Sequence, residues 1–108
     1  MNTNTEDHDD GERAVYGRTI KFYPGQVAVT PAALAALEKQ GRSPLELLGR
    51  HVAGDWGDLF DEDRRSNDQA LRGGHRLLSS YDLGGDVRIW VITEADRLAT
   101  TLLLPSDY

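Results

Sequence analysis

The chain of 108 residues contains no cysteine. Neither a disulfide framework nor a thiolate metal site can therefore form, which fits a protein of the reducing cytoplasm. No apolar run approaches the roughly 20 residues that a membrane span needs. Residues 1–12 also lack the basic and apolar regions of a secretory signal peptide, so we expect a cytoplasmic protein with no place in a membrane.

Basic residues are scarce as well: 12 Lys and Arg stand against 18 Asp and Glu, and the formal net charge is −6. Residues 1–13 hold five of the acids and one Arg, a net charge of −4, which leaves −2 for the rest of the chain. The folded part is therefore nearly balanced and has no broad basic surface for a phosphate backbone. We expect a protein partner rather than nucleic acid bound through long-range electrostatics.

Residues 1–13 have only one apolar side chain, that of Met1. Such a segment cannot bury enough surface to offset the entropy of ordering it, so we predict a disordered acidic tail. His8 lies among acids and could bind a metal weakly, but a solvated tail is the favoured interpretation. Residues 14–108 have the usual size of one domain, and we predict a single α+β domain there.

Helix-capping residues, together with glycine and proline, mark an extended arm and two helices. The arm covers residues 15–29 and is interrupted by a Pro-Gly pair that suits a type II turn. The helices cover about 31–40 and 44–53. Each starts with a hydroxyl residue followed by proline, Thr30-Pro31 and Ser43-Pro44, which is a typical N-terminal cap. Each helix ends before a glycine.

The second half of the domain changes from helical to strand periodicity. A third helix over 61–72 opens with three acids, which complement the helix dipole, and it has few apolar residues. Three β-rich runs follow, 76–83, 87–93 and 99–104, joined by short turns. The fold class is thus α+β: an N-terminal extended arm, two to three helices, then a three-stranded antiparallel β-meander. We expect the helices to cover one face of the sheet and the arm to cover part of the other.

The central strand over 87–93 alternates between two apolar faces. Val87, Ile89 and Val91 share one face, and we predict that Ile89 or Val91 is fully buried. The opposite face carries Trp90, which is more typical of core packing than of a stacking platform for bases.

Most of the folded part resembles a family of small proteins encoded on bacterial plasmids, phages and integrated elements. The stretches that carry the resemblance are GQVAVTPAALAALEKQGRSPLELLGRHVAGDWGDL, NDQAL, RLLSSY and WVITEADRLATTLLLPSDY. The family is labelled plasmid-related or as a type I restriction subunit M. The resemblance implies a mobile-element origin. A methyltransferase is not expected, because a domain of this size has no glycine-rich nucleotide loop and no long α/β sheet.

A fold-level likeness to ribonucleases of the barnase, colicin and RelE type suggests a second function. These enzymes also place helices before an antiparallel meander. In a metal-independent ribonuclease, His51 would transfer the proton, Arg97 would contact the scissile phosphate and Thr100 would position it. The structural alternatives are His51 at a helix C-terminus and Arg97 paired within its turn, and we favour both.

The second helix carries His51 near its end. We place Leu45, Leu48 and Val52 on its buried face, with Leu47 beside them.

A binding surface is predicted from two polar segments. The loop 54–59 holds Trp56 between two glycines, for which we favour core packing over stacking. The hairpin end 93–101 contains several charged side chains, although a simple turn needs only one such group. We predict that the two segments lie on the same side of the domain and form its working surface. Its residues are Asp55, Trp56, Asp58, Glu94, Asp96 and Arg97.

Acids are dense between Asp55 and Asp63, but their spacing does not match an EF-hand, and helix capping with solvation explains them. No cofactor motif is found, and we expect neither a metal nor a cofactor.

Two functions remain open at this point. One is a non-catalytic protein-interaction module of a mobile element that modulates or inhibits a host defence system. The other is the metal-independent ribonuclease or toxin. The sequence leaves open whether the chain is an enzyme and how many copies assemble.

Overall fold

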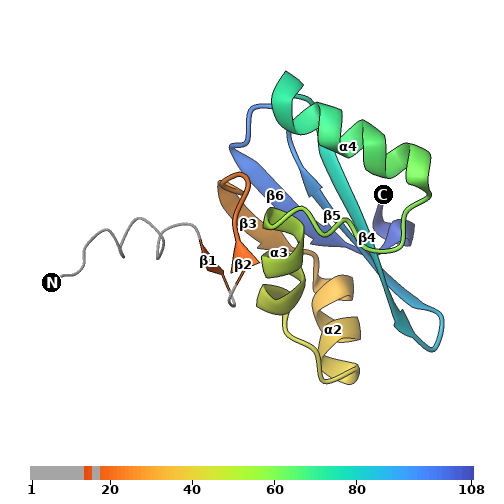
Figure 1. Cartoon of the computed structure of the whole chain (residues 1–108). Coiled ribbons are helices and arrows are strands. Elements are labelled where there is room, and N and C mark those ends of the chain that lie inside the picture. Colours follow the sequence, from red (N-terminus) through yellow and green to blue (C-terminus); the bar gives the residue numbers. More distant parts are fainter. Residues whose placement is uncertain (1–13, 16–17) are drawn as a thin grey trace, which may run out of the picture.

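The computed structural model describes residues 14–15 and 18–108, and the predicted acidic tail lies outside these residues. Two short strands, β1 and β2, pair antiparallel ahead of the main domain. The domain contains three α-helices, a four-stranded sheet and a C-terminal 3₁₀ helix, η1 (Figure 1). The elements are β1 (Ala14–Val15), β2 (Arg18–Thr19), β3 (Gln26–Val29), α2 (Pro31–Lys39), α3 (Pro44–Val52), α4 (Asp61–Gly73), β4 (Leu77–Gly84), β5 (Val87–Thr93), β6 (Ala99–Leu103) and η1 (Pro105–Asp107).

The sheet has the order β3-β6-β5-β4. Strands β4, β5 and β6 form the predicted antiparallel meander, so the α+β class is confirmed. The end of the arm adds a fourth strand, β3, which pairs parallel with β6 at the edge of the sheet. The sequence did not show this pairing, because its two strands lie about 70 residues apart and no turn joins them.

The predicted helix caps are present. Thr30 Oγ1 accepts a hydrogen bond from the amide of Ala33 at 3.1 Å, and Ser43 Oγ accepts one from Leu45 at 3.2 Å. Helix α4 ends at Gly74, whose φ of 71° places it in the left-handed conformation. These caps satisfy amides and carbonyls that a helix end leaves open.

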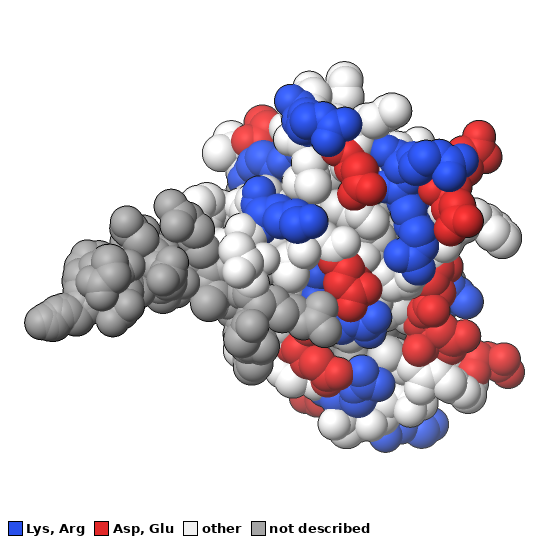
Figure 2. Space-filling view, in the orientation of Figure 1, with Lys and Arg blue, Asp and Glu red and all other residues white. Residues whose placement is uncertain are grey.

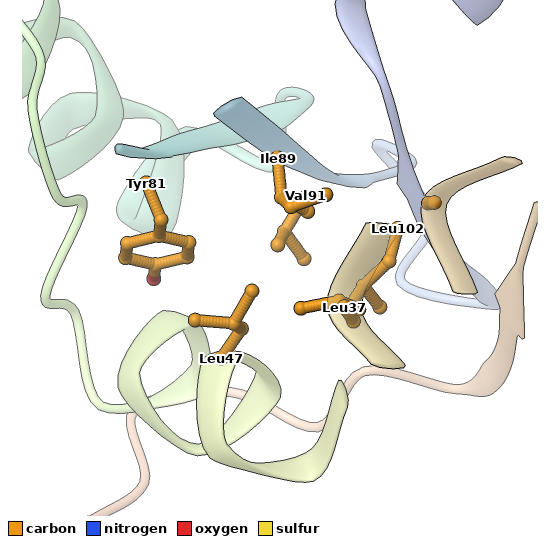
Figure 3. Packing of buried hydrophobic residues seen from close by; sticks show 7 residues of the cluster. Leu37, Leu47, Tyr81, Ile89, Val91 and Leu102 are labelled. Atoms are coloured by element: carbon orange, nitrogen blue, oxygen red, sulfur yellow. The ribbon is translucent and has the colours of Figure 1, made fainter. Parts of the chain in front are cut away.

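The main core lies between the sheet and helices α2 and α3 (Figure 3). Leu37 and Leu47 point from the helices toward the sheet, where Val91 and Leu102 face them. Ile89 and Val91 are both fully buried, which confirms the central strand as a core element.

A second cluster shows that the arm covers the helical face of the sheet. Phe22 packs with Val52 of α3, with Trp56 and with Leu77 of β4. The prediction that the arm covers the opposite face is therefore wrong. The amide of Lys21 donates to the carbonyl oxygen of Val52 at 2.7 Å, which holds the arm against the end of α3.

The C-terminus contributes to the opposite face. The ring of Tyr108 meets Trp90 edge-on, with 5.8 Å between centroids. Arg76 donates a hydrogen bond of 2.8 Å to the Tyr108 hydroxyl. The chain end thus contacts an aromatic side chain that points away from the helices.

Helix α3 is rotated relative to the predicted apolar stripe. Leu45 is 54% exposed, whereas Leu47 and His51 are fully buried. Residues four apart share a helix face, so burying Leu47 against the sheet also carries His51 into the core. Among the described helices, none is long and apolar enough to cross a membrane.

Candidate functional site

His51 lies at the centre of a chain of buried hydrogen bonds. Its Nδ1 is 2.6 Å from Ser79 Oγ, and its Nε2 is 2.9 Å from Thr93 Oγ1. Thr93 Oγ1 is in turn 2.6 Å from Thr100 Oγ1, which donates to the carbonyl oxygen of Pro24 at 2.7 Å. The chain thus links α3 and the three meander strands to the arm.

The final acceptor determines every proton in this chain. A carbonyl oxygen only accepts, so the single hydroxyl proton of Thr100 points to Pro24 and that of Thr93 points to Thr100. The Nε2 of His51 must then donate to Thr93, and in the neutral ring its Nδ1 accepts from Ser79. A neutral ring with its proton on Nε2 thus satisfies every bond of the chain.

The surroundings of His51 also favour the neutral ring. Phe22 meets it edge-on at 5.2 Å and Trp56 at 5.8 Å between ring centroids. Burial, and secondly the positive charge of Arg97, lowers the pKa of His51 to about 3. The ring is uncharged at neutral pH, and no solvent reaches it in this conformation.

Arg97 acts as a clamp between the β5–β6 hairpin and the end of α4. Its Nη1 donates to the carbonyl oxygens of His75 (2.7 Å), Ala95 (3.0 Å) and Glu94 (3.1 Å). Its Nη2 donates to the carbonyl oxygen of Ala70 at 2.9 Å. The residue has a φ of 63°, a conformation in which glycine is usual, and these bonds hold it there.

Phe22 contacts one side chain from each of the two segments of the working-surface hypothesis, the loop 54–59 and the hairpin end. The Phe22 ring lies between them: Trp56 stacks on it at 6.3 Å between centroids, and the Arg97 guanidinium carbon lies 5.8 Å from its centre. Trp56 is only 2% exposed, however, and its Nε1 donates to Asp68 Oδ1 at 3.0 Å. His51, Thr100 and Trp56 are therefore buried in the core, whereas Arg97 is only partly buried.

The four acids predicted for the binding surface each accept a hydrogen bond within the fold. Asp55 pairs with Arg50 at 2.8 Å, and Glu94 pairs with Arg76 at 3.2 Å. Asp58 and Asp96 accept backbone amides, Asp58 across to β4 and Asp96 within its own turn. The hydrogen bond that Arg50 donates to Asp55 raises the pKa of Arg50.

Two adjoining hollows flank the β4–β5 hairpin, with volumes of about 370 and 320 Å³. Both are lined by Asp86, Val87 and Arg88, and neither is lined by a predicted site residue. Within the described part of the chain, no three His, Asp or Glu side chains are grouped to hold a metal ion.

The β4 edge of the sheet is closed by side chains and a loop. The Asn67 side chain donates to the carbonyl oxygen of Leu78 at 2.6 Å and accepts from its amide at 3.2 Å. Two residues further, the amide of Ser80 donates to Trp56 and its carbonyl oxygen accepts from Asp58 at 2.6 Å. Sequence reasoning missed Asn67, which is one of two amide side chains in this polar helix.

The segment that forms β3 and most of α2 carries no charged side chain, although the carboxylate of Asp107 accepts a hydrogen bond from Thr30 Oγ1 at 2.7 Å. Residues 22–37 contain no Asp, Glu, Lys or Arg, although 28% of the chain is charged. Tyr23 is 62%, Leu34 40% and Val27 39% exposed. On the face shown in Figure 2, charges of both signs are interspersed.

Comparison of the chain with protein-family models, with curated proteins and with solved structures found no match.

Proposed function

We propose that this chain is a non-catalytic protein-interaction module, carried by a mobile genetic element and acting on a host defence complex. The observation that carries the proposal is the uncharged, exposed surface of residues 22–37. Interface centres are depleted of charge and enriched in tyrosine and other apolar anchors. A segment that exposes Tyr23, Val27 and Leu34 and has no charged side chain of its own fits a protein partner.

The same surface argues against nucleic acid as the partner. Phosphate backbones are bound mainly through Lys and Arg, and residues 22–37 supply neither. The mobile-element part of the proposal rests on the sequence resemblance alone.

A ribonuclease remains the second candidate because His51 and Thr100 both bond Thr93, and His51 and Arg97 both contact Phe22. The environment of these residues argues against a ribonuclease. A general base must come within hydrogen-bond reach of the proton that it removes, and both His51 and Thr100 are fully buried. The guanidinium of Arg97 is directed at four backbone carbonyl oxygens, so a phosphate would have to displace them.

The binding function is tested with a surface variant and a matched control. Leu34→Glu places a charge in the uncharged surface, and Ser66→Glu places the same charge on the exposed side of α4. The tagged chain is cross-linked in a bacterial host, and the enriched protein is purified separately and titrated by calorimetry. We expect Leu34→Glu to weaken binding at least tenfold and Ser66→Glu to bind as the wild type does.

The defence function is tested in a host with a type I restriction system. Expression of the chain should raise the plating efficiency of unmodified phage, and Leu34→Glu should abolish this effect. RNA cleavage by the purified chain that is lost in a folded His51→Gln variant would instead establish the ribonuclease.

A further inference from the structure

The two edges of the sheet differ in how their backbone groups are satisfied. Along β4, the outward amides and carbonyl oxygens of Leu78 and Ser80 are bonded by Asn67 and by the loop at Trp56–Asp58. Along β3, no described residue bonds the outward groups. We propose that β3 is the docking edge and accepts an extended strand of the partner protein. This inference rests on the proposed interaction function.

The register identifies the free groups. The amides of Gln26 and Thr30 donate to Leu98 and Leu102 at 2.9 Å, so alternate residues of this segment point toward β6. Val27 and Val29 therefore direct their N–H and C=O groups away from the sheet. A strand that pairs along this edge gains up to four backbone hydrogen bonds.

The side chains around the edge select an uncharged segment. Natural edges are protected by short strand length, lysine, proline, inward-pointing charge or a covering loop. The strand β3 is short, with four residues, but these carry no charge and no proline. Val27 is 39% exposed, and Leu98, at the start of the neighbouring strand, is 70% exposed. A partner strand with apolar side chains at alternate positions would cover both Val27 and Leu98.

A second copy of the chain fits the edge less well than a different protein does. Self-pairing of a four-residue strand buries far less than the roughly 1,000 Å² that a specific interface needs. A strand from a larger partner can continue over Tyr23 and Leu34 and so enlarge the contact.

Hydrogen exchange measured by NMR tests the free edge directly. In the free full chain, the amides of Val27 and Val29 should exchange fast, whereas those of Ala28 and Thr30 should be protected. Protection of Val27 and Val29 in the free chain would overturn the proposal, because it would mean that the edge is already occupied by a second copy or by the chain itself.

Binding is tested with peptides selected from a random 12-residue phage-display library on the immobilised full chain. We expect the selected peptides to alternate apolar residues, and to protect the amides of Val27 and Val29 when bound. Val27→Lys should weaken their binding at least tenfold. Ser66→Lys, the same charge on the exposed side of α4, should leave it unchanged.

Val27→Pro supplies a second variant, since proline at this position removes only the outward N–H and leaves the bonds to β6. Equal binding by both folded Val27 variants and the wild type would overturn the docking edge. If a host protein still binds and is sensitive to Leu34→Glu, the proposed function stands without this edge. If the peptides bind β3 but no host protein binds, the edge stands and the proposed function fails.

Discussion

Acidification should destabilise the protein through His51 specifically. The folded-state pKa of His51 is lowered to about 3, against about 6.5 in an unfolded chain. The unfolded state therefore binds the proton more tightly, and the stability contributed by the neutral ring is complete above pH 6.5. It is lost progressively as the pH falls from 6.5 toward 3.

The magnitude follows from the linkage relation. At pH 5, proton binding to His51 favours the unfolded state by about 1.5 pH units, or about 2 kcal/mol of unfolding free energy. Below pH 3 the loss approaches about 5 kcal/mol. The free-energy loss at pH 5 is the more useful value, because it depends only on the pKa of His51 in the unfolded state as long as its folded-state pKa lies well below 5. It is a large share of the stability of a small domain.

The assay is urea unfolding at pH 7.5, 6 and 5, followed by tryptophan fluorescence, for the wild type and for His51→Gln. The variant keeps every carboxylate and both other histidines, so their titration cancels in the comparison. Between pH 7.5 and pH 5, the free energy of unfolding of the wild type should fall by about 2 kcal/mol more than that of His51→Gln. Parallel losses in the two proteins would refute the buried neutral ring, as would an NMR titration of His51 near pH 6.

Three further predictions concern stability. Arg97→Lys should lower the free energy of unfolding by about 1–3 kcal/mol in urea, because an ammonium cannot reproduce the guanidinium clamp on four carbonyl oxygens; an unchanged midpoint would contradict the clamp. Ile89→Ala should cost about 2–5 kcal/mol in the same assay, since the side chain is fully buried, and a cost below 1 kcal/mol would place it outside the core. Gly25→Ala should lower the melting temperature more than Gly41→Ala does. Both glycines have a positive φ, but a Cβ at Gly25 would lie 2.4 Å from the backbone of Leu98, while nothing lies within 4 Å at Gly41. Equal melting temperatures would show that this close approach is absent in solution.

The sequence by itself determined the local elements. The caps Thr30 and Ser43 and the period-two run 87–93 each depend on a few neighbouring residues, and the structure has all of them. The burial of Ile89 followed from the same alternation. These predictions succeeded because helix caps, short turns and strand faces are decided by bonds and side-chain directions within a few residues.

Only the tertiary structure decided what surrounds each candidate residue. The rotation of α3 places His51 in the core rather than at a solvated helix end, and the return of the chain past it provides the aromatic and hydroxyl contacts. The pairing of β3 with β6 and the closure of the β4 edge by Asn67 join segments distant in the sequence. Such contacts depend on which apolar faces pack together across the whole domain, and no local pattern records that choice. For this reason the sequence could name His51, Arg97 and Trp56, but only the fold could show that they are held within it and that β3 is left open.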